Sequence, residues 1–276
     1  MTGPIVLKVG GELLEESGHL ATVVTAVAAV NATERNLVLV HGGGREIDRA
    51  LERAGIAKQQ VDGLRITDEA TLAIVVPVLA GIVNPRFVAA LNTAGVPAVG
   101  LTGADGRSVR SNTAAAHRSR DGRLVDLGRV GVPDAGSEMP LLNVLLAAGF
   151  VPVLASIGVD REGRLLNVNA DTLAGHVAAR LAARRLIVAG TTPGVVGGNG
   201  RTVETVDAAG IAALIEDGTA TAGMIAKLRG CEHALAHGVD DVIIVDGRDR
   251  VALIRAAGGD SSSNTTRITA GLNTCM

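Results

Sequence analysis

Short, nearly unbroken apolar runs recur along this chain and are separated by longer segments whose apolar residues are spaced for a helix. The runs lie at residues 5–9, 36–40, 98–101, 151–157, 186–189 and 241–245. Only Lys8 interrupts the first of them. An apolar run of this length predicts a strand buried on both faces. Such strands are typical of a parallel sheet covered by helices on both sides.

Helical spacing fills the intervals between these runs. The Ala- and Val-rich segment 20–31 joins the first two runs and predicts the crossover helix of a βαβ unit, which makes the sheet parallel. In the next interval Ile47, Ala50 and Leu51 recur on one helical face, and Gly55 ends the helix. Further helices are expected from 69 to 79 and beyond with a kink at Pro77, and at 86–94, 141–148, 172–183, 211–216 and 221–236. The pattern predicts an α/β fold.

One long segment departs from this alternation. Residues 102–136 are rich in Gly, Arg, Ser and Asp, and the turn signal Asp121-Gly122 lies between polar stretches, so we expect exposed hairpins that form a flap. Another hairpin turn is expected at 160–163. A flexible Gly/Ser stretch is expected at 258–264, before a brief strand or tail. The sequence contains no long linker and no internal repeat.

Composition narrows the class of protein. The 276 residues are 47% hydrophobic, carry a formal charge of −2, and include two Phe but no Trp or Tyr. Without basic clusters or aromatic platforms, no nucleic-acid partner is expected. Two cysteines, Cys231 and Cys275, are too few for a disulfide framework, which favours a reducing, cytoplasmic location. The most apolar stretch, 73–83, is shorter than the roughly 20 residues of a membrane span and contains Pro77, so no membrane partner is expected.

Glycines follow two of the predicted strands. Lys8 precedes the pair Gly10-Gly11, and the second run ends in His41-Gly42-Gly43-Gly44 before a helix. A helix N-terminus carries unpaired N–H groups, and glycine removes side chains that would block a phosphate, so this pattern favours an anion cradle. The alternatives are a solvated lysine at a strand end and a tight turn that serves only packing. The fingerprints of P-loops and of dinucleotide-binding loops are both missing from these turns.

Three short polar side chains alternate ahead of the predicted helix at 172–183. The alternation puts Asn167, Asn169 and Asp171 on one side of an extended segment, although Asp171 is equally explained as a helix cap. The acid Asp171 lies between Lys8 and Lys227 in sequence. Lysines and an acid suit phosphoryl transfer, which needs positioning and charge neutralisation more than covalent chemistry.

Other polar residues carry weaker signals. Arg65 has a planar fork that suits a carboxylate, and its alternative is an ordinary surface arginine. The six histidines show no metal-ligand spacing, so each is expected to be a satisfied or solvated side chain and no metal site on the protein is expected.

Six motifs resemble those of the amino-acid kinase family and occur in the same order. They are Lys8-Val9-Gly10-Gly11, His41-Gly42-Gly43-Gly44, Gly63-Leu64-Arg65-Ile66-Thr67, Asp126-Leu127-Gly128-Arg129-Val130-Gly131, Asn167-Val168-Asn169-Ala170-Asp171 and Gly223-Met224-Ile225-Ala226-Lys227. The resemblance covers nearly the whole chain and implies a three-layer αβα sandwich around a mainly parallel sheet of about eight strands. It implies one domain over residues 1–276, with an amino-acid-substrate lobe at about 1–180 and a nucleotide lobe at about 181–276. It also implies homodimers formed through the N-terminal lobe.

The resemblance further implies an activity. This is the ATP-dependent phosphorylation of the side-chain carboxylate of an N-acylated acidic amino acid, N-acetyl-L-glutamate, in arginine biosynthesis, with Mg²⁺ carried by ATP. An aminoadipate-type substrate is the nearest rival, and the run 167–171 matches the glutamate branch better. A catalytically silent nucleotide- or amino-acid-sensing subunit is another alternative, and intact Lys8, Asp171 and Lys227 argue against it. Because four residues precede the first strand, we expect neither an extra N-terminal helix nor an arginine-sensitive hexamer.

The motifs also imply a role for each matching residue. Lys8 and Lys227 would stabilise the transferring phosphoryl group, and Asp171 would organise the lysines. Arg65 and Asn167 would hold the substrate's other carboxylate and its α-substituent. Backbone N–H groups for the phosphate and the acceptor carboxylate would come from Gly10, Gly11, Gly43 and Gly44. The nucleotide would contact Gly10, Gly11, Thr191, Thr192, Gly194, Val195, Val196, Gly223, Met224 and Lys227, although Thr191-Thr192-Pro193-Gly194 stands where the family usually has Asp-Val-x-Gly.

Overall fold

An eight-stranded sheet forms the centre of the computed structural model, which describes residues 3–34, 36–119, 121–198, 200–220, 222–260 and 265–270. The strands lie in the order β16-β18-β17-β13-β1-β2-β10-β5, and those from β17 to β5 are parallel to their neighbours. β18 runs antiparallel to β17. Their bounds are β1 Ile5–Val9, β2 Leu37–His41, β5 Ala98–Leu101, β10 Val151–Ala155, β13 Arg185–Gly190, β16 Thr205–Val206, β17 Val242–Asp246 and β18 Thr265–Ile268. The mainly parallel sheet predicted above is confirmed.

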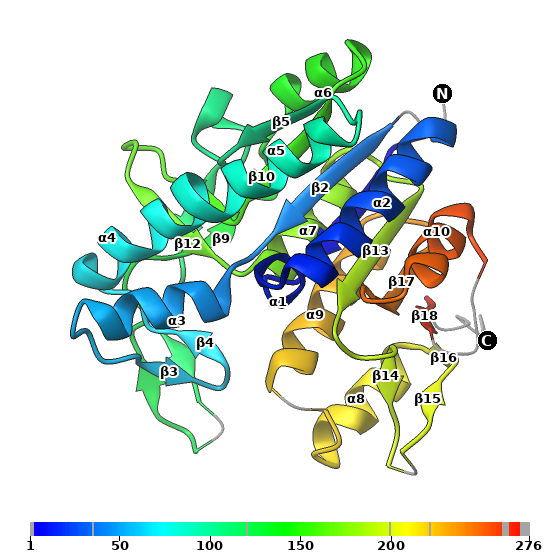
Figure 1. Cartoon of the computed structure of the whole chain (residues 1–276). Coiled ribbons are helices and arrows are strands. Elements are labelled where there is room, and N and C mark those ends of the chain that lie inside the picture. The colour runs from blue at the N-terminus through cyan, green and yellow to red at the C-terminus, as the bar shows by residue number, and fades with distance from the viewer. Residues whose placement is uncertain are drawn as a thin grey trace.

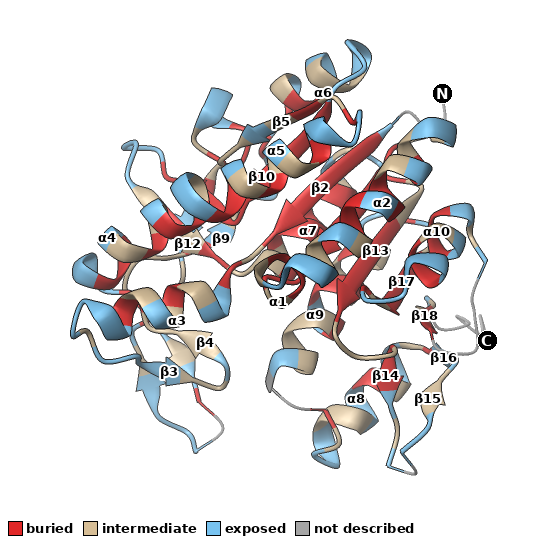
Figure 2. Cartoon of the chain, in the orientation of Figure 1, coloured by how far each residue is buried: buried red, intermediate tan, exposed pale blue. Residues whose placement is uncertain are grey.

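Helices cover both faces of this sheet, and the three-layer αβα prediction is confirmed (Figure 1). The apolar core on one face includes residues of α1 (Glu12–Glu15), α2 (Ser17–Thr33), α3 (Gly44–Arg53), α4 (Glu69–Val76), α5 (Asn84–Thr93) and α10 (Arg250–Gly258). The other is covered by α6 (Pro140–Ala147), α7 (Ala170–Arg180), α8 (Ala208–Glu216) and α9 (Ala222–Ala236). The central strands are buried on both faces, as Figure 2 shows, which explains their unbroken apolar runs.

The helix expected to kink at Pro77 is instead continuous over Glu69–Thr93, with a π-helical segment, η1 (Pro77–Val83), between α4 and α5. Proline has no N–H to donate in the α-helical pattern, and the wider π turn accommodates the break. The expectation that the most apolar stretch is too short for a membrane span is therefore wrong, because this 25-residue helix contains an 18-residue window of mean hydropathy 1.9 and matches a span by length and composition. Val75, Leu79 and Val83 of this helix are buried in the core against the sheet.

A second, smaller sheet covers one end of the molecule. It has the order β11-β12-β9-β6 and consists of Ile157–Val159, Leu165–Val168, Val130–Pro133 and Ser111–Thr113. The predicted exposed hairpin is confirmed in β7 (His117–Arg118) and β8 (Leu124–Val125). The rest of 102–136 is less exposed than expected, because it contains a short 3₁₀ turn (Asp105–Arg107), two strands of this sheet and the buried Val109 and Leu127.

The remaining elements are two hairpins, one more helix and the C-terminal strand. Two more hairpins are β3 (Gln60–Val61) with β4 (Leu64–Arg65) and β14 (Val195–Val196) with β15 (Thr202–Val203). The helix α10 was not predicted, although Asp249 caps it by accepting hydrogen bonds from the amides of Val251 and Ala252. Residues 261–264 of the predicted flexible stretch lie outside the described residues, and β18 is the brief strand expected after it.

Candidate functional site

Two glycine turns meet at the carboxyl ends of the neighbouring strands β1 and β2. A Cβ atom on Gly11 would lie 2.6 Å from Cα and 2.8 Å from N of Gly43, so the two turns pack backbone against backbone. No other residue fits at Gly11 without moving the second turn. Because β1 and β2 are parallel, their carboxyl ends share one edge of the sheet, which is where ligands bind in open α/β sheets.

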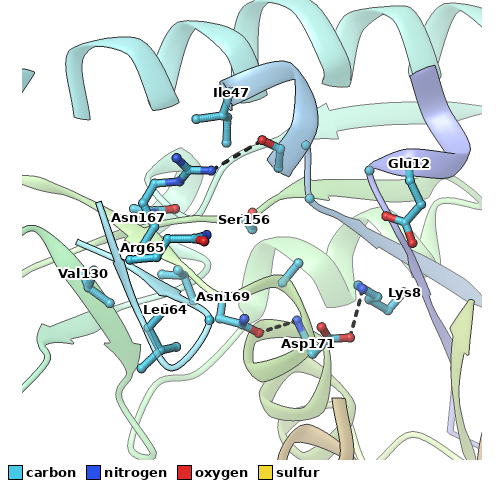
Figure 3. Close-up of a pocket in the computed structure, with 18 residues that line it drawn as sticks. Lys8, Glu12, Ile47, Leu64, Arg65, Val130, Ser156, Asn167, Asn169 and Asp171 are labelled. Carbon is cyan, nitrogen blue, oxygen red and sulfur yellow. Dashed lines mark hydrogen bonds and ion pairs between the residues drawn. The ribbon is translucent and has the colours of Figure 1, made fainter. Parts of the chain in front are cut away.

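Beside these turns lies a cavity of about 260 Å³ (Figure 3). Its lining comes from the two turns, the β3–β4 hairpin, the small sheet and the start of α7. The residues are Lys8, Gly11, Glu12, Gly42, Gly43, Gly44, Ile47, Gln60, Gly63, Leu64, Arg65, Val130, Ser156, Asn167, Val168, Asn169, Ala170 and Asp171.

Lys8 and Asp171 form an ion pair in this cavity, with Nζ 2.9 Å from Oδ1. Side chains alternate along β1, so Lys8 points to the face on which α7 packs. The residues are only 5% and 9% exposed. Asn169 caps α7 by accepting hydrogen bonds from the amides of Asp171 and Thr172, so the alternative that Asp171 is the cap is wrong. The Asp171 carboxylate is thereby left to the lysine.

The helix α9 brings Lys227 to the same place. A Cβ on Gly175 of α7 would lie 2.4 Å from the Gly230 carbonyl oxygen, so the two helices approach closely. The Nζ of Lys227 lies beside Gly190 at the end of β13, 2.5 Å from where a Cβ would be. Burial lowers the pKa of Lys227 and the charge of Lys8 lowers it further, while Asp171 and Glu12 oppose this.

Arg65, at the other end of the cavity, is held from the protein side. Its Nη2 donates to the carboxylate of Asp48 and, at 3.4 Å, to the carbonyl of Gly44. Its Nη1 is buried and has no hydrogen-bond partner among the described residues. Burial opposes the charge on Asp48, but hydrogen bonds from Lys58 and Arg65 hold the pKa of Asp48 below its ordinary value. The ordinary surface arginine considered above is therefore the wrong alternative.

The Arg65 loop is tied to the strand that carries Asn167. The Asn167 side chain donates to Thr67 Oγ1 at 3.0 Å, and Thr67 Oγ1 donates to the Arg65 carbonyl at 3.2 Å. Thr67 and Gly128 form a β-bridge in which a Cβ on Gly128, whose φ is +69°, would lie 2.5 Å from the Thr67 carbonyl oxygen. These contacts explain why two distant motifs converge on one end of the cavity.

A second, smaller cavity of about 150 Å³ lies against the C-terminal half of the sheet. It is lined by Thr192, Val195, Val196, Leu214, Thr219, Ala220 and Met224. Thr192 Oγ1 is buried and has no hydrogen-bond partner among the described residues. The loop is fixed by Thr266, whose Oγ1 accepts from the amide of Val195 at 2.7 Å and donates to the Val203 carbonyl at 2.6 Å.

The predicted site residues are thus distributed over two cavities. The larger contains Lys8, Gly11, Gly43, Gly44, Arg65, Asn167 and Asp171, and the smaller contains Thr192, Val195, Val196 and Met224. The other predicted site residues, Gly10, Thr191, Gly194, Gly223 and Lys227, are all described and line neither cavity. The expectation for Gly10 needs a correction, because its amide donates to the Ala189 carbonyl at 2.9 Å and is not available to a phosphate.

Sequence reasoning missed several residues of the site. Glu12 follows the glycine pair directly and lines the larger cavity, as does Ser156. Asp48 lies one helical turn after Gly44 and accepts a hydrogen bond from Arg65. His41 is a satisfied histidine, one of the two outcomes expected for it, and it lies fully buried beside the second glycine turn with both ring nitrogens hydrogen-bonded. Glu12, Asp48 and His41 lie close to a glycine motif in the sequence, whereas Ser156 follows the strand at 151–155 and had no such signal.

Fold and site together define an α/β protein with a cavity lined by cationic side chains and glycine turns at the carboxyl edge of a parallel sheet. The model of the amino acid kinase family matches residues 3–246. The chain belongs to the amino acid kinase family.

Individual relatives agree with this assignment. An acetylglutamate kinase of Oleidesulfovibrio alaskensis is 38% identical over 247 residues, which cover 88% of this chain and 83% of the relative. The crystal structure of the smu.665 protein of Streptococcus mutans is 29% identical, with a TM-score of 0.79 over 98% of this chain and 100% of that one. An N-acetylglutamate synthase of Neisseria gonorrhoeae, in complex with coenzyme A and N-acetyl-glutamate, is 26% identical with a TM-score of 0.82, and the match covers 97% of this chain and 59% of that one.

Proposed function

We propose that this protein catalyses the ATP-dependent phosphorylation of the side-chain carboxylate of N-acetyl-L-glutamate, a step of arginine biosynthesis. The observation that carries the proposal is the polarity of the larger cavity. One end has the Lys8–Asp171 pair beside two glycine turns, and the other has the buried, unsatisfied Nη1 of Arg65. A molecule with a carboxylate at each end matches this arrangement.

The reacting end would work by positioning and charge neutralisation. Lys8 and Lys227 are assigned to the charge that spreads over the transferring phosphoryl oxygens, and Asp171 holds the ammonium of Lys8 at 2.9 Å. The amides of Gly11, Gly43 and Gly44 are assigned to the phosphoryl group and the acceptor carboxylate. α3 begins at Gly44, so its first amides have no acceptor within the helix.

The remaining groups would set specificity. Arg65 is assigned to the α-carboxylate and Asn167 to the acetamido substituent. ATP is assigned to the smaller cavity and to the strip between it and Lys227, which includes Thr191, Thr192, Gly194, Gly223 and Met224. Mg²⁺, when bound, would neutralise the phosphates of ATP. Glu12 and Asp171 are the carboxylates of the larger cavity that would bind this ion, either directly or through its water molecules.

The larger setting belongs to the same proposal. Residues 1–180 would form the substrate lobe and 181–276 the nucleotide lobe of one domain, although a single sheet runs through both. Homodimers would form through the N-terminal lobe, whose surface exposes Ile82, Val132 and Val144 by 48%, 49% and 63%. We place the enzyme in the cytoplasm. Light scattering of the purified chain tests the dimer.

A trapping assay tests the activity. ATP, Mg²⁺ and N-acetyl-L-glutamate should yield ADP and an acyl phosphate that hydroxylamine converts to a hydroxamate. N-acetyl-L-glutamine, which lacks the acceptor carboxylate, is the matched control and should yield none. If an N-acylated aminoadipate were phosphorylated faster than N-acetyl-L-glutamate, it would replace N-acetyl-L-glutamate as the proposed substrate. Tight ligand binding without ADP release would support a sensing subunit and sink the kinase assignment.

A further inference from the structure

A chain of hydrogen bonds leads from the sheet interior to the second glycine turn. Asn84, 5% exposed at the junction of η1 and α5, donates from Nδ2 to the Val153 carbonyl at 2.9 Å and lies 3.0 Å from His41 Nε2. The other ring nitrogen of His41, Nδ1, lies 3.0 Å from the carbonyl oxygen of Gly42. The imidazole is fully buried and packs edge to face on Phe87.

The partners leave His41 a single protonation state. A carbonyl oxygen only accepts, so Nδ1 must carry a proton for Gly42. The Val153 carbonyl fixes the orientation of the Asn84 amide, whose NH₂ group then faces Nε2, so Nε2 must be unprotonated. Burial lowers the pKa of His41 to about 4, while the hydrogen bond to Gly42 opposes this and the nearby charges of Arg86 and Glu46 act in opposite directions.

The surrounding structure is shaped around this arrangement. A Cβ on Gly100 would lie 2.1 Å from Asn84 Oδ1, so the strand beside Asn84 must be free of a side chain there. A Cβ on Gly43 would lie 2.9 Å from Leu79 and 3.2 Å from Val83, both in the π-helical segment. One irregular helix therefore supports the turn twice, through apolar contact at Gly43 and through the Asn84 amide.

The bond to Gly42 also fixes the next amide. A trans peptide is planar, with its C=O and N–H pointing in opposite directions. The Gly42 carbonyl points to the buried imidazole, so the N–H of Gly43 points away from it, and Gly43 lines the larger cavity.

We propose that His41 is a positioning residue whose neutral Nδ1–H tautomer, imposed by Asn84, aims the Gly43 amide at the anionic group bound in the larger cavity. The anion is a phosphoryl or carboxylate group, and its identity as the transferring phosphoryl rests on the function proposed above. His41 itself contacts neither substrate nor nucleotide in this role.

The tautomer can be observed directly in the parent protein. We would record long-range ¹H–¹⁵N spectra of the ¹⁵N-histidine-labelled full chain without ligands and assign His41 by its loss in a His41→Asn variant. The expected signal is an Nδ1–H, Nε2-unprotonated ring that stays neutral as the pH falls to about 5, since the pKa is about 4. An Nε2–H ring, or one that titrates like a free histidine, overturns the proposal.

Two pairs of variants test the consequence for the turn. In His41→Asn the side-chain amide takes the place of Nδ1 and still reaches Gly42, whereas in His41→Gln it takes the place of Nε2 and does not. We expect His41→Asn to keep at least about a tenth of the parental kcat and His41→Gln to lose about a hundredfold, on the scale of one misdirected oxyanion donor. Equal losses in both would indicate a merely structural histidine.

The second pair is Asn84→Asp with Asn92→Asp as its control. Asn92 lies in the same helix and makes comparable hydrogen bonds, to the carbonyls of Val88 and Ala98 at 3.0 Å, away from the turn. A carboxylate at position 84 would accept from Nε2 and protonate His41, so kcat should fall at least about tenfold with KM for the amino acid within about threefold. The control should keep parental kcat. Parental kcat in Asn84→Asp would sink the positioning role.

These measurements separate this proposal from the proposed function. If the parent phosphorylates no acylated amino acid, the kinase assignment fails, but the His41 tautomer is still measured. The Gly43 amide resonance should then still shift on titration with inorganic phosphate in the parent and stay in place in Asn84→Asp. An unresponsive Gly43 amide in the parent overturns the positioning role. If the variants fail to fold, the two measurements on the parent protein, the His41 tautomer and the shift of the Gly43 amide, still test the proposal.

Discussion

Arg65 is paired with Asp48 of α3, and this pairing leaves one nitrogen of its guanidinium, Nη1, for a ligand. Nη2 is taken by the Asp48 carboxylate, while Nη1 is buried without a hydrogen-bond partner among the described residues. Asp48 is in turn held by Lys58 at 2.7 Å. The fork is therefore oriented before any substrate arrives, and orientation in advance reduces the entropy lost on binding.

The first prediction follows from this geometry. In Arg65→Lys, a single ammonium cannot serve both Asp48 and a substrate carboxylate in the planar geometry of the guanidinium. We expect KM for N-acetyl-L-glutamate to rise by about tenfold or more with kcat within about threefold, as measured by steady-state kinetics with saturating ATP. Lys58→Ala, which removes the outer partner of Asp48, is the control and should change KM by less than about twofold. A rise in KM for ATP alone would place Arg65 on the nucleotide side.

The second prediction concerns Lys227. Replacing it with methionine keeps most of the side-chain volume in its buried place beside Gly190 but removes the charge assigned to the transferring phosphoryl group. We expect kcat to fall by roughly 10²–10³, the scale of one preorganised donor, with smaller changes in both KM values. Lys58→Met is a surface control. A Lys227→Met enzyme with parental kcat would remove this lysine from the chemistry.

The strands and the glycine motifs were predictable because their signals are local. A run buried on both faces has to be apolar along its length, and a backbone that touches another backbone has to be glycine, as at Gly11. These two rules located the sheet, its carboxyl edge and Lys8. The amphipathic α3 was likewise readable from its spacing.

What failed depends on contacts between distant segments. Asn169 and Asp171 are both favoured caps; in the structure Asn169 accepts the helix amides, while the Asp171 carboxylate pairs with the distant Lys8. The engagement of the Gly10 amide follows from the neighbouring strand β13, whose Ala189 lies far away in sequence. The sequence predicts a kink at Pro77, and local propensity alone does not predict the π-helical segment Pro77–Val83, whose Val83 packs against Gly43 of a distant turn.

The third prediction is a pH dependence. Lys227 would act in its protonated form, and burial together with the charge of Lys8 lowers its pKa, so kcat should begin to fall at a pH below that of an ordinary lysine. Glu12 favours the charged form, so Glu12→Gln should move this alkaline limb to still lower pH. Glu16→Gln, at an exposed neighbouring position, is the charge-matched control and should leave the limb in place.

The pH–rate profile of kcat checks this prediction. Lys227→Arg supplies a further comparison, because a guanidinium remains protonated over the whole pH range of the assay. The alkaline fall in kcat should therefore disappear in this variant, even if its kcat is reduced. A limb that moves to higher pH in Glu12→Gln, or that persists in Lys227→Arg, would assign the titration to another group.

The last prediction tests how the fold positions Lys227. Gly230 lies one turn after Lys227 in α9, and a Cβ at this position would lie 2.7 Å from the carbonyl oxygen and 2.9 Å from the carbonyl carbon of Asp171. Backbone atoms cannot rotate away, so Gly230→Ala must push α9 from α7 and separate Lys227 from the Lys8–Asp171 pair.

Gly258→Ala is the matched control, because Gly258 also lies in a helix and its Cβ would meet nothing within 4 Å. Alanine favours a helix over glycine by about 1 kcal/mol, so the control should be as stable as the parent or more so, with parental kcat. Gly230→Ala should unfold at lower temperature and, in the folded fraction, lose kcat by about tenfold or more. Thermal unfolding by circular dichroism and active-site-normalised kinetics measure the two effects separately. If Gly230→Ala were as stable and as fast as Gly258→Ala, the close approach of α7 and α9 would not be what places Lys227.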